Sequence, residues 1–240
     1  MSLAPGRQAG HAEIAEWRSM PLSPVAPTGP SAPDPSAVVR SSAIELLALA
    51  QSGLHYANDQ FDRQRYAQAR SVGLRLMELV SVADLGKLER SVALEQGHAT
   101  PKVDVRGAIF HDGKVLLVQE RSDQLWTLPG GWCDVLESPR EAVAREIKEE
   151  SGLTVEVVEL AAVLDRERQA QLPAFPFHVY KMFFLCRILE VGTPDELETL
   201  DVGWFAPDDL PPLSTGRVTK TQLQMMVDRH LHPGRPAAFD

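Results

Sequence analysis

The stretch that decides the fold is Gly130–Leu153, which reads GGWCDVLESPREAVAREIKEESGL. Its central part predicts a helix that begins at Pro139. Ser138 precedes this proline, and Glu141 follows Ser138 by three residues, which is the pattern of a capping box with proline at the first helical position. Gly152 stands after the last expected turn, where a left-handed glycine often ends a helix. The sequence therefore specifies both ends of this helix.

Acidic side chains are the second feature of this helix. Glu146, Glu149 and Glu150 fall on one side of it within one turn, and the apolar positions fall on the other side. Carboxylates at this spacing repel one another and weaken an isolated helix. Hard cations such as Mg²⁺ or Mn²⁺ bind such groups of oxygens. The helix taken alone still favours the simpler interpretation, a solvated acidic face.

The spacing around the helix decides between these two interpretations. Five residues separate Gly131 from Glu137, and seven more separate Glu137 from Arg145-Glu146-Ile147. One residue then precedes Glu149-Glu150, and one more precedes Gly152-Leu153. This spacing matches the Nudix box in full, so the chain resembles the Nudix hydrolases. The resemblance implies an α+β fold, a Nudix α/β/α sandwich with a mixed sheet. It also implies an enzyme that hydrolyses the phosphoanhydride of a nucleoside diphosphate linked to another moiety, X.

The resemblance implies a role for each residue of the box. The implied metal-binding groups are the Gly131 carbonyl, Glu146, Glu149, Glu150 and, in an outer position, Glu137. Arg145 corresponds to the arginine that orients the glutamates. The implied cofactor is Mg²⁺ or Mn²⁺, because divalent ions neutralise a pyrophosphate, orient it and acidify the attacking water.

The base that takes a proton from this water varies within the superfamily. It is either a glutamate of the box or one from a later loop. Glu149 is the candidate in the box. Glu198, which precedes a strand expected over residues 201–205, is the candidate in a loop. The residues expected to carry catalysis are therefore Glu149, Glu146, Glu198 and Arg145.

Three further residues are candidates for substrate binding. Arg106 and Arg121 stand where they could face the phosphates, which arginine binds with two parallel hydrogen bonds. Trp126, like Trp132, flanks the Leu-Pro-Gly-Gly turn and could stack on a base. The alternative for the arginines is a surface ion pair, and the alternative for the tryptophans is the core. Loops outside the box, among them residues 166–176, are expected to set specificity.

The alternation of apolar residues from Pro101 onward predicts the strands of the main domain. Strands are expected over 103–110, 115–118, 155–164, 177–189 and 201–205, and a second helix over 220–230. Asp112-Gly113 predicts a tight turn between the first two strands. The domains expected are a disordered proline-rich tail (1–40), a helical N-terminal domain (41–100) and a Nudix domain (101–240).

The helical segment is expected to hold three short helices. The first covers residues 44–50 and ends at Gly53, the second follows Asp62 up to residue 80, and the third covers 84–94. Such helices make a poor core alone, so we expect them to pack on the next domain or on a second copy.

Motifs within and beyond this segment narrow the resemblance. Leu54-His55-Tyr56, Phe61-Asp62 and Arg65-Tyr66 resemble the helical N-terminal domain of a Nudix subgroup, hydrolases of X-linked nucleoside diphosphates. That subgroup includes a CDP-choline pyrophosphatase, whose helical domain serves dimerisation. The resemblance therefore implies a homodimer formed through residues 41–100.

Composition limits the remaining function classes. The net charge of −9 argues against a chain that mainly coats nucleic acid. No apolar run approaches the roughly 20 residues that span a membrane. Two cysteines, Cys133 and Cys186, are too few for a disulfide scaffold, which favours a cytoplasmic protein.

The expected function is a metal-dependent pyrophosphohydrolase with a small-molecule nucleotide substrate. It would cleave a CDP-alcohol or ADP-ribose into a nucleoside monophosphate and phosphorylated X. Two alternatives remain open: a Nudix regulator that senses a nucleotide without turnover, and an enzyme that acts on RNA 5′ ends or as an exonuclease. The first alternative usually comes with lost box glutamates and a basic DNA-binding domain, and neither is seen here.

Overall fold

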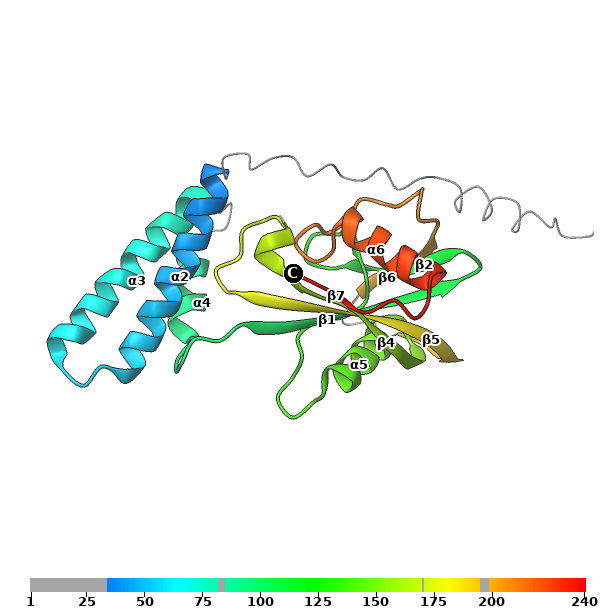
Figure 1. Ribbon diagram of the computed structural model, residues 1–240, viewed down its shortest axis with the longest axis horizontal. Helices are drawn as coiled ribbons and strands as arrows, with labels where there is room; N and C mark the ends of the chain where they lie inside the picture. The colour runs from blue at the N-terminus through cyan, green and yellow to red at the C-terminus, as the bar shows by residue number, and fades with distance from the viewer. Residues whose placement is uncertain (1–33, 82–84, 170, 195–198) are drawn as a thin grey trace, which may run out of the picture. The chain divides into compact units, whose positions relative to one another are not determined.

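The computed structural model describes residues 34–81, 85–169, 171–194 and 199–240. These residues form five α-helices, a short 3₁₀ helix and seven strands (Figure 1). The elements are α2 (Pro35–Tyr56), α3 (Gln60–Val80), α4 (Leu85–Leu94), β1 (Lys102–His111), β2 (Lys114–Glu120), β3 (Trp126–Thr127), α5 (Pro139–Ser151), β4 (Leu153–Asp165), η1 (Arg166–Gln169), β5 (Val179–Val191), β6 (Thr199–Phe205), α6 (Lys220–Leu231) and β7 (Ala238–Phe239). No helix among these residues is long and apolar enough to cross a bilayer.

The strands form one mixed sheet in the order β3-β2-β1-β5-β4-β7, and β6 pairs with β2. Strands β1 and β5 are parallel from the pair Lys102–Val179 to the pair Ile109–Cys186. The pairs β1–β2, β2–β3, β2–β6 and β4–β5 are antiparallel, and β4–β7 is parallel. The mixed sheet confirms the expected fold class.

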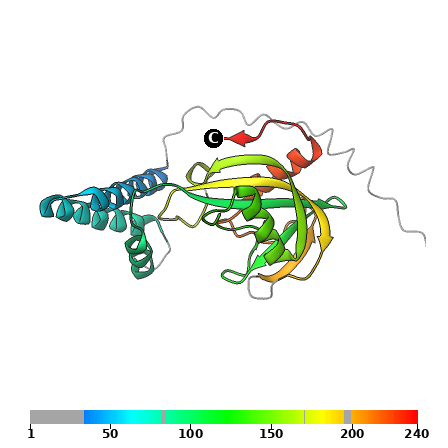
Figure 2. The same ribbon diagram turned by 90° about the horizontal axis from the view of Figure 1, so that it is seen from below.

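Helices cover both faces of this sheet. On one face, Leu223 and Met226 of α6 belong to a buried cluster with strand residues such as Phe183. On the other face, Val143 and Ile147 of α5 pack in a second buried cluster. Figure 1 shows α5 and α6 on opposite sides of the strands, and Figure 2 shows α5 lying across them. Each such apolar side chain contributes roughly 1.5–3 kcal/mol when buried. The layers are those of the expected α/β/α sandwich.

The two ends of α5 confirm the reading of its sequence. The Ser138 hydroxyl accepts a hydrogen bond from the Glu141 N–H at 3.3 Å, and the Glu141 carboxylate accepts one from the Ser138 N–H at 2.9 Å. Gly152 ends the helix in the left-handed region, with φ of 73°. The Asp112-Gly113 turn is also confirmed, since both residues have positive φ, at 49° and 73°.

The first helix departs from the expectation at both of its ends. Helix α2 begins at Pro35, and the Asp34 side chain caps it by accepting a hydrogen bond from Ser36 N–H at 3.1 Å. The expected disordered tail is therefore wrong for residues 35–40, and residues 1–33 lie outside the described part of the chain. Gly53 does not end α2. A Cβ there would lie 2.2 Å from Cδ1 of Tyr66, so this glycine lets α3 pack closely on α2.

The helical segment packs on the next domain, which was one of the two expected alternatives. A buried cluster joins Leu47 and Met77 of the helices to Ala174, and Phe177 packs against it. Ala174 and Phe177 belong to the loop between η1 and β5. This loop is therefore anchored on the N-terminal helices.

The loop before the box helix completes the edge of β1. Backbone N–H groups of Val105 and Gly107 donate to the carbonyls of Gly131 and Pro129 at 2.8 and 2.9 Å. Gly130, between them, has φ of 138°, and a Cβ there would lie 2.0 Å from the Val105 carbonyl oxygen. Only glycine fits at this position, because both the backbone angle and the close approach exclude a side chain.

Replacing Gly130 with alanine should therefore destabilise the protein strongly. We expect Gly130→Ala to lower the free energy of unfolding by about 3 kcal/mol or more, because the β1 edge must open to make room. The matched control is Gly113→Ala, which also has positive φ but no atom within 4 Å of its Cβ. It should cost only about 1–2 kcal/mol. Urea unfolding of both variants measures the difference, and equal losses would contradict the close-packed loop.

Candidate active site

A cavity of about 390 Å³ lies beside the box helix. Backbone atoms of the Gly130–Gly131 loop form part of its wall, together with side chains from β1, β2, α5, η1 and β5. The ionisable and aromatic side chains that line it are Asp104, Glu120, Glu146 and Glu150, Arg106, Arg166, Lys181 and Arg217, and Trp132 and Phe175. The cavity thus combines carboxylates, cations and aromatic rings.

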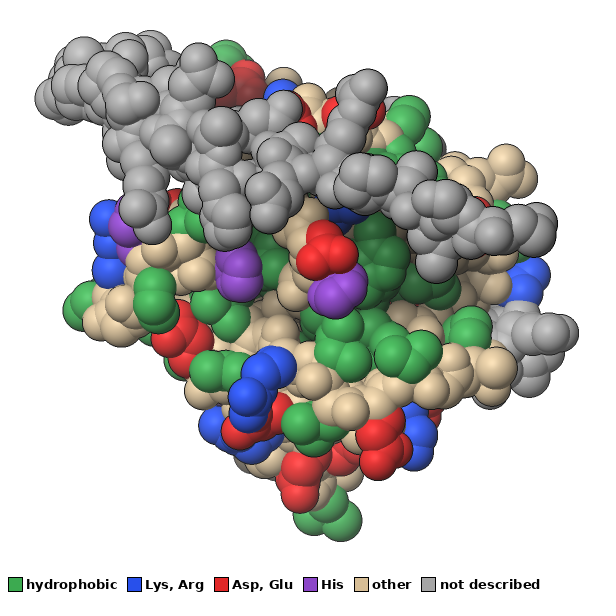
Figure 3. Space-filling view, turned by 90° about the vertical axis from the view of Figure 1, so that its right-hand side faces the viewer, with side chains coloured by type: hydrophobic (Ala, Val, Ile, Leu, Met, Phe, Trp, Pro, Cys, Tyr) green, Lys and Arg blue, Asp and Glu red, His purple; other side chains and the backbone are tan. Residues whose placement is uncertain are grey.

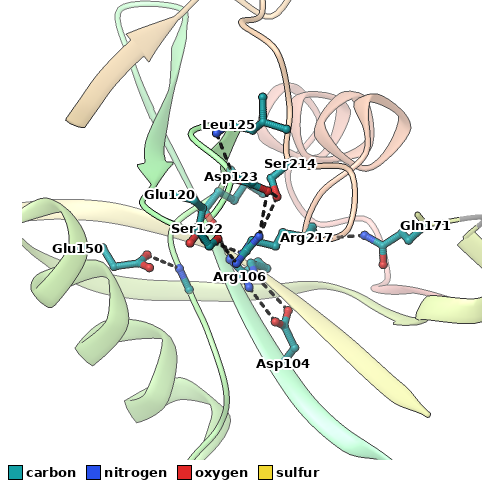
Figure 4. Close-up of polar contacts among 12 residues, drawn as sticks. Asp104, Arg106, Glu120, Ser122, Asp123, Leu125, Glu150, Gln171, Ser214 and Arg217 are labelled. Carbon is teal, nitrogen blue, oxygen red and sulfur yellow. Dashed lines mark hydrogen bonds and ion pairs between the residues drawn. The ribbon is translucent and has the colours of Figure 1, made fainter. Parts of the chain in front are cut away.

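Two box glutamates face this cavity. Glu150 is only 7% exposed, and its Oε2 accepts a hydrogen bond from Gly130 N–H at 2.8 Å (Figure 4). Burial raises the pKa of Glu150 to about 8, against the opposing charge of Arg106. Burial also raises the pKa of Glu146. A Cβ on Gly131 would lie 2.8 Å from Oε2 of Glu146, so Gly131 lets this carboxylate sit against the loop.

Arg145 holds the other box glutamates on the outer side of the helix. Its Nε and Nη2 donate to the two oxygens of Glu137 at 2.8 and 3.0 Å. Its Nη1 donates to Glu149 at 2.8 Å and lies 3.1 Å from Oε1 of Glu146. The hydrogen bond from Arg145 lowers the pKa of Glu137. One guanidinium group thus fixes three carboxylates that would otherwise repel one another.

The donor set suits a hard divalent cation, because every side-chain donor is a carboxylate oxygen. The carboxylates are nevertheless not gathered around one point. Among the described residues, no three or more His, Cys, Asp or Glu side chains come together as a metal site. The reason is geometric, since Glu137 and Glu149 bind Arg145 while Glu146 and Glu150 face the cavity. The Gly131 carbonyl already accepts the Val105 N–H.

A buried ion-pair cluster forms the opposite wall. Arg106 donates to both oxygens of Asp104 at 3.0 and 2.8 Å (Figure 4). It also donates to the Leu128 carbonyl at 3.1 Å. Lys181 donates to Asp104 at 2.6 Å. Burial favours neutral Asp104, but the charges of Arg106 and Lys181 outweigh it and keep the pKa of Asp104 below its usual value. Two cations on one carboxylate leave this wall positive.

A second ionic contact closes the end of the cavity near α6. Arg217 lies 2.8 Å from Oε1 of Glu120 and donates to Ser214 and Ser122 at 2.9 and 3.0 Å (Figure 4). Asp123 accepts from Ser214 at 2.7 Å. These contacts tie the loop before α6 to the end of β2, so that Arg217 keeps its place in the cavity wall.

Two known protein families match parts of this chain. The NUDIX domain family matches residues 101–224, which is more than half of the chain. The chain belongs to the Nudix family. Residues 39–91 match a second family, the UDP-X-like N-terminal oligomerisation domain. The protein is therefore a Nudix hydrolase with the helical N-terminal domain that the sequence indicated.

Individual relatives agree with this assignment. The chain is 41% identical over 193 residues to the "Putative ADP-ribose pyrophosphatase YjhB" of Bacillus subtilis, covering 80% of this chain and 92% of that protein. An ADP-ribose pyrophosphatase structure from Streptococcus suis shares 44% identity, with a TM-score of 0.54, over 59% of this chain and all of that one. A UDP-X diphosphatase structure shares 32% identity, with a TM-score of 0.55, over 85% and 99% of the two chains.

The Nudix cavity does not contain every residue that the sequence singled out. Trp126 does not line it: its ring packs edge-on against Phe205, with 4.6 Å between the ring centroids, and the partly buried side chain lies against a core cluster. The stacking of Trp126 on a base stays a prediction. Trp132 is the tryptophan at the cavity. Arg121 is exposed outside the lining, and Glu198 lies outside the described residues.

Arg106 lines the cavity, but its guanidinium is already bound to other groups of the protein. It is 3% exposed, and three of its N–H groups bind Asp104 and the Leu128 carbonyl. These bonds use three of its five N–H groups, so Arg106 adds positive charge to the cavity wall, and its direct binding of phosphate stays a prediction.

Sequence reasoning missed other residues of the cavity. Lys181 interrupts the apolar run at 179–186, and this charge within a buried run was a signal that could have been used. Arg166 and Phe175 fall in the segment expected to set specificity, but nothing in their spacing distinguished them. Only the fold brings them to the box.

The buried carboxylate of Glu150 should make stability depend on pH. The pKa of Glu150 is raised from 4.5 to about 8 in the folded protein, so the folded state binds this proton more tightly than the unfolded state does. Stability is therefore lost as pH rises between these two values. Glu150→Gln cannot ionise but can still accept the Gly130 hydrogen bond. In EDTA, its stability relative to the wild type should therefore increase from pH 5 to 8, by at least about 1 kcal/mol.

Thermal unfolding across this pH range measures the effect. The control is Glu141→Gln on the same helix, because hydrogen bonds from Ser138 lower the pKa of Glu141 and this carboxylate is ionised throughout the range. Its difference from the wild type should stay constant over the same range. A Glu150→Gln curve parallel to that of the wild type would show that Glu150 ionises as an ordinary surface glutamate.

Arg145 should matter for activity more than for stability. In Arg145→Ala, Glu137, Glu146 and Glu149 lose their shared partner, and we expect kcat/KM to fall about 100-fold. Unfolding should change by no more than about 1 kcal/mol, because the pairs are partly exposed. Arg145→Lys should recover only part of the activity, since an ammonium cannot bind Glu137 with two parallel bonds while reaching Glu149. Steady-state kinetics of both variants test this, and full activity in Arg145→Ala would refute the role.

Proposed function

We propose that this Nudix hydrolase cleaves a nucleoside diphosphate linked to X into a nucleoside monophosphate and phosphorylated X. ADP-ribose is the first substrate to consider and a CDP-alcohol the second. The observation that carries the proposal is the cavity, in which box carboxylates face a wall made positive by Arg106 and Lys181. A diphosphate fits such a site, because one wall can bind it directly and the other can bind it through a cation.

The comparisons support ADP-ribose over a CDP-alcohol. The similarity to the Bacillus subtilis protein extends over 80% of this chain, so it includes the helical N-terminal segment as well as the box. The Streptococcus suis structure supports the same substrate class within the Nudix domain. A CDP-alcohol rests only on the resemblance of the N-terminal motifs.

Mg²⁺ or Mn²⁺ is the cofactor we propose, held by Glu146 and Glu150 with Glu149, Glu137 and the Gly131 carbonyl as further ligands. When bound, such an ion neutralises the diphosphate and lowers the pKa of water. Gly130 N–H and Arg106 favour the ionised form of Glu150, and Arg145 holds Glu149 beside Glu146. Glu149 is our candidate for the proton acceptor, with Glu198 as the alternative. Water attacks phosphorus, and no covalent intermediate is proposed.

Surface charge favours a small substrate over RNA. On the face shown in Figure 3, Lys and Arg side chains of the described residues are interspersed with Asp and Glu, without a continuous basic patch. The net charge of −9 agrees with this. RNA binding needs an extended run of cations along the backbone of the nucleic acid.

We also propose that residues of α2–α4 form a homodimer, in line with the description of the matching domain as an oligomerisation domain. Leu49, Phe61 and Leu79 are 58, 71 and 77% exposed on these helices. Replacing all three with Gln should convert the dimer into a monomer in analytical ultracentrifugation. A wild-type protein that is already monomeric at about 10 μM would contradict the dimer.

A turnover panel tests the proposed reaction. The protein with Mg²⁺ is offered ADP-ribose, CDP-choline, UDP-glucose, NADH and 5′-triphosphate RNA, and products are separated by chromatography. We expect AMP and ribose phosphate from ADP-ribose, loss of turnover in EDTA, and at least about a 100-fold fall in kcat for Glu149→Gln and Glu150→Gln. Glu156→Gln, an exposed glutamate paired with Arg187, is the control and should keep full activity.

Two other results of the panel would contradict the proposal and indicate a different function. ADP-ribose binding without turnover would indicate a nucleotide-sensing regulator. Turnover of RNA ends alone, with affinity that falls steeply with salt, would indicate an RNA-directed enzyme.

A further inference from the structure

Three charged side chains connect the N-terminal helix α2 to the cavity. Arg40 of α2 donates from Nε to Oε2 of Glu167 at 2.5 Å. The other carboxylate oxygen of Glu167 accepts from Nη1 of Arg166 at 3.0 Å. The three side chains are only 10, 13 and 6% exposed. A carboxylate shared by two arginines in such a buried position is costly to assemble, unless each group is paired.

The far end of this chain of contacts lies in the cavity. Arg166 lines the cavity and donates from Nη2 to the Pro173 carbonyl at 2.5 Å. Its guanidinium lies over the ring of Phe175 at 5.5 Å, and Phe175 stacks with Trp132 at 6.1 Å. Arg166 is therefore fixed on an aromatic ring in the wall of the cavity.

Arg40 sets the net charge of this group of three side chains. Glu167 alone would neutralise Arg166 as a simple pair. With Arg40 on its second oxygen, Glu167 is shared, and the group of three keeps one net positive charge. Because these three side chains are at most 13% exposed, water screens this charge less than it would screen a charge at the surface.

We propose that Arg40 is a positioning residue for substrate: through Glu167 it holds Arg166 in place, and its own charge keeps the group of three net positive toward an anionic diphosphate or the phosphate of X. This rests on the proposed function, because it assumes that the cavity binds such an anion. The helical domain then contributes to the active site of its own chain, in addition to any role in oligomerisation. The alternative is that the three residues only join the two domains.

Kinetics of Arg40 variants separate these two roles. In Arg40→Gln, KM for ADP-ribose should rise about tenfold, because Arg166 acts in binding, while kcat changes less than about twofold. Arg40→Lys should recover most of this loss, since it restores the charge beside Glu167. The control is Arg65→Gln on α3, whose partner Asp62 lies at the surface, and it should leave KM unchanged.

A double-mutant cycle adds a readout that a merely structural contact would not change. Once Arg166→Gln has raised KM, Arg40→Gln should add little to it, because both act through the same guanidinium. Additive effects on KM would overturn the proposal. It would also be overturned by an Arg40→Gln variant with the KM of the wild type, or by one that loses thermal stability while KM and kcat return to normal at low temperature.

Binding measurements keep this test independent of turnover. If the wild type hydrolyses no substrate of the panel, the proposed function fails. Calorimetry with ADP-ribose in EDTA then still reports on Arg40. Weaker binding by Arg40→Gln and Arg166→Gln but not by Arg65→Gln would support the role of Arg40 in anion binding. Equal binding by all four proteins would refute it.

Discussion

The hydrogen bond from Gly130 N–H to Glu150 is the contact on which the site depends. It joins the loop that completes β1 to the last turn of α5, so the sheet edge and the box helix position each other. Gly130 can make it only because no side chain lies between its backbone and Val105. Burying a carboxylate in this way is unfavourable, and the raised pKa of Glu150 reflects that cost. A charged substrate with its cation would relieve it, which is a reason for a hydrolase of phosphoanhydrides to keep such a group.

Local chemistry explains which parts of the fold could be predicted from sequence. The caps of α5 and the Asp112-Gly113 turn depend on neighbouring residues alone, and both were predicted. Gly53 was misread as a helix end because its role depends on Tyr66 of another helix, which a local pattern does not contain. The packing of Trp126 against the core could not be predicted for the same reason, because its partner Phe205 comes from a strand much later in the chain.

The residues of the site also fall into two groups, those found from a local pattern and those that only the fold brings together. The box residues were found because their spacing is fixed within one loop and one helix. Lys181 and Arg166 were missed because they reach the box through the pairing of β1 with β5 and the turn after β4. The box carboxylates of the cavity therefore come from one helix, whereas its cations come from segments far apart in the sequence.

The loop between η1 and β5 shows why the helical segment and the Nudix domain belong together. Ala174 and Phe177 of this loop pack with the core of the N-terminal helices, while Pro173 and Phe175 line the cavity. Neighbouring residues of this loop thus face either the N-terminal helices or the cavity. The apolar contacts with the helices keep the cavity-lining residues in position. If the helices were absent, Ala174 and Phe177 would be exposed to water, and the loop would lose the burial that fixes Phe175 under Arg166. The helices thus stabilise a wall of the cavity whether or not they also bind a second copy of the chain.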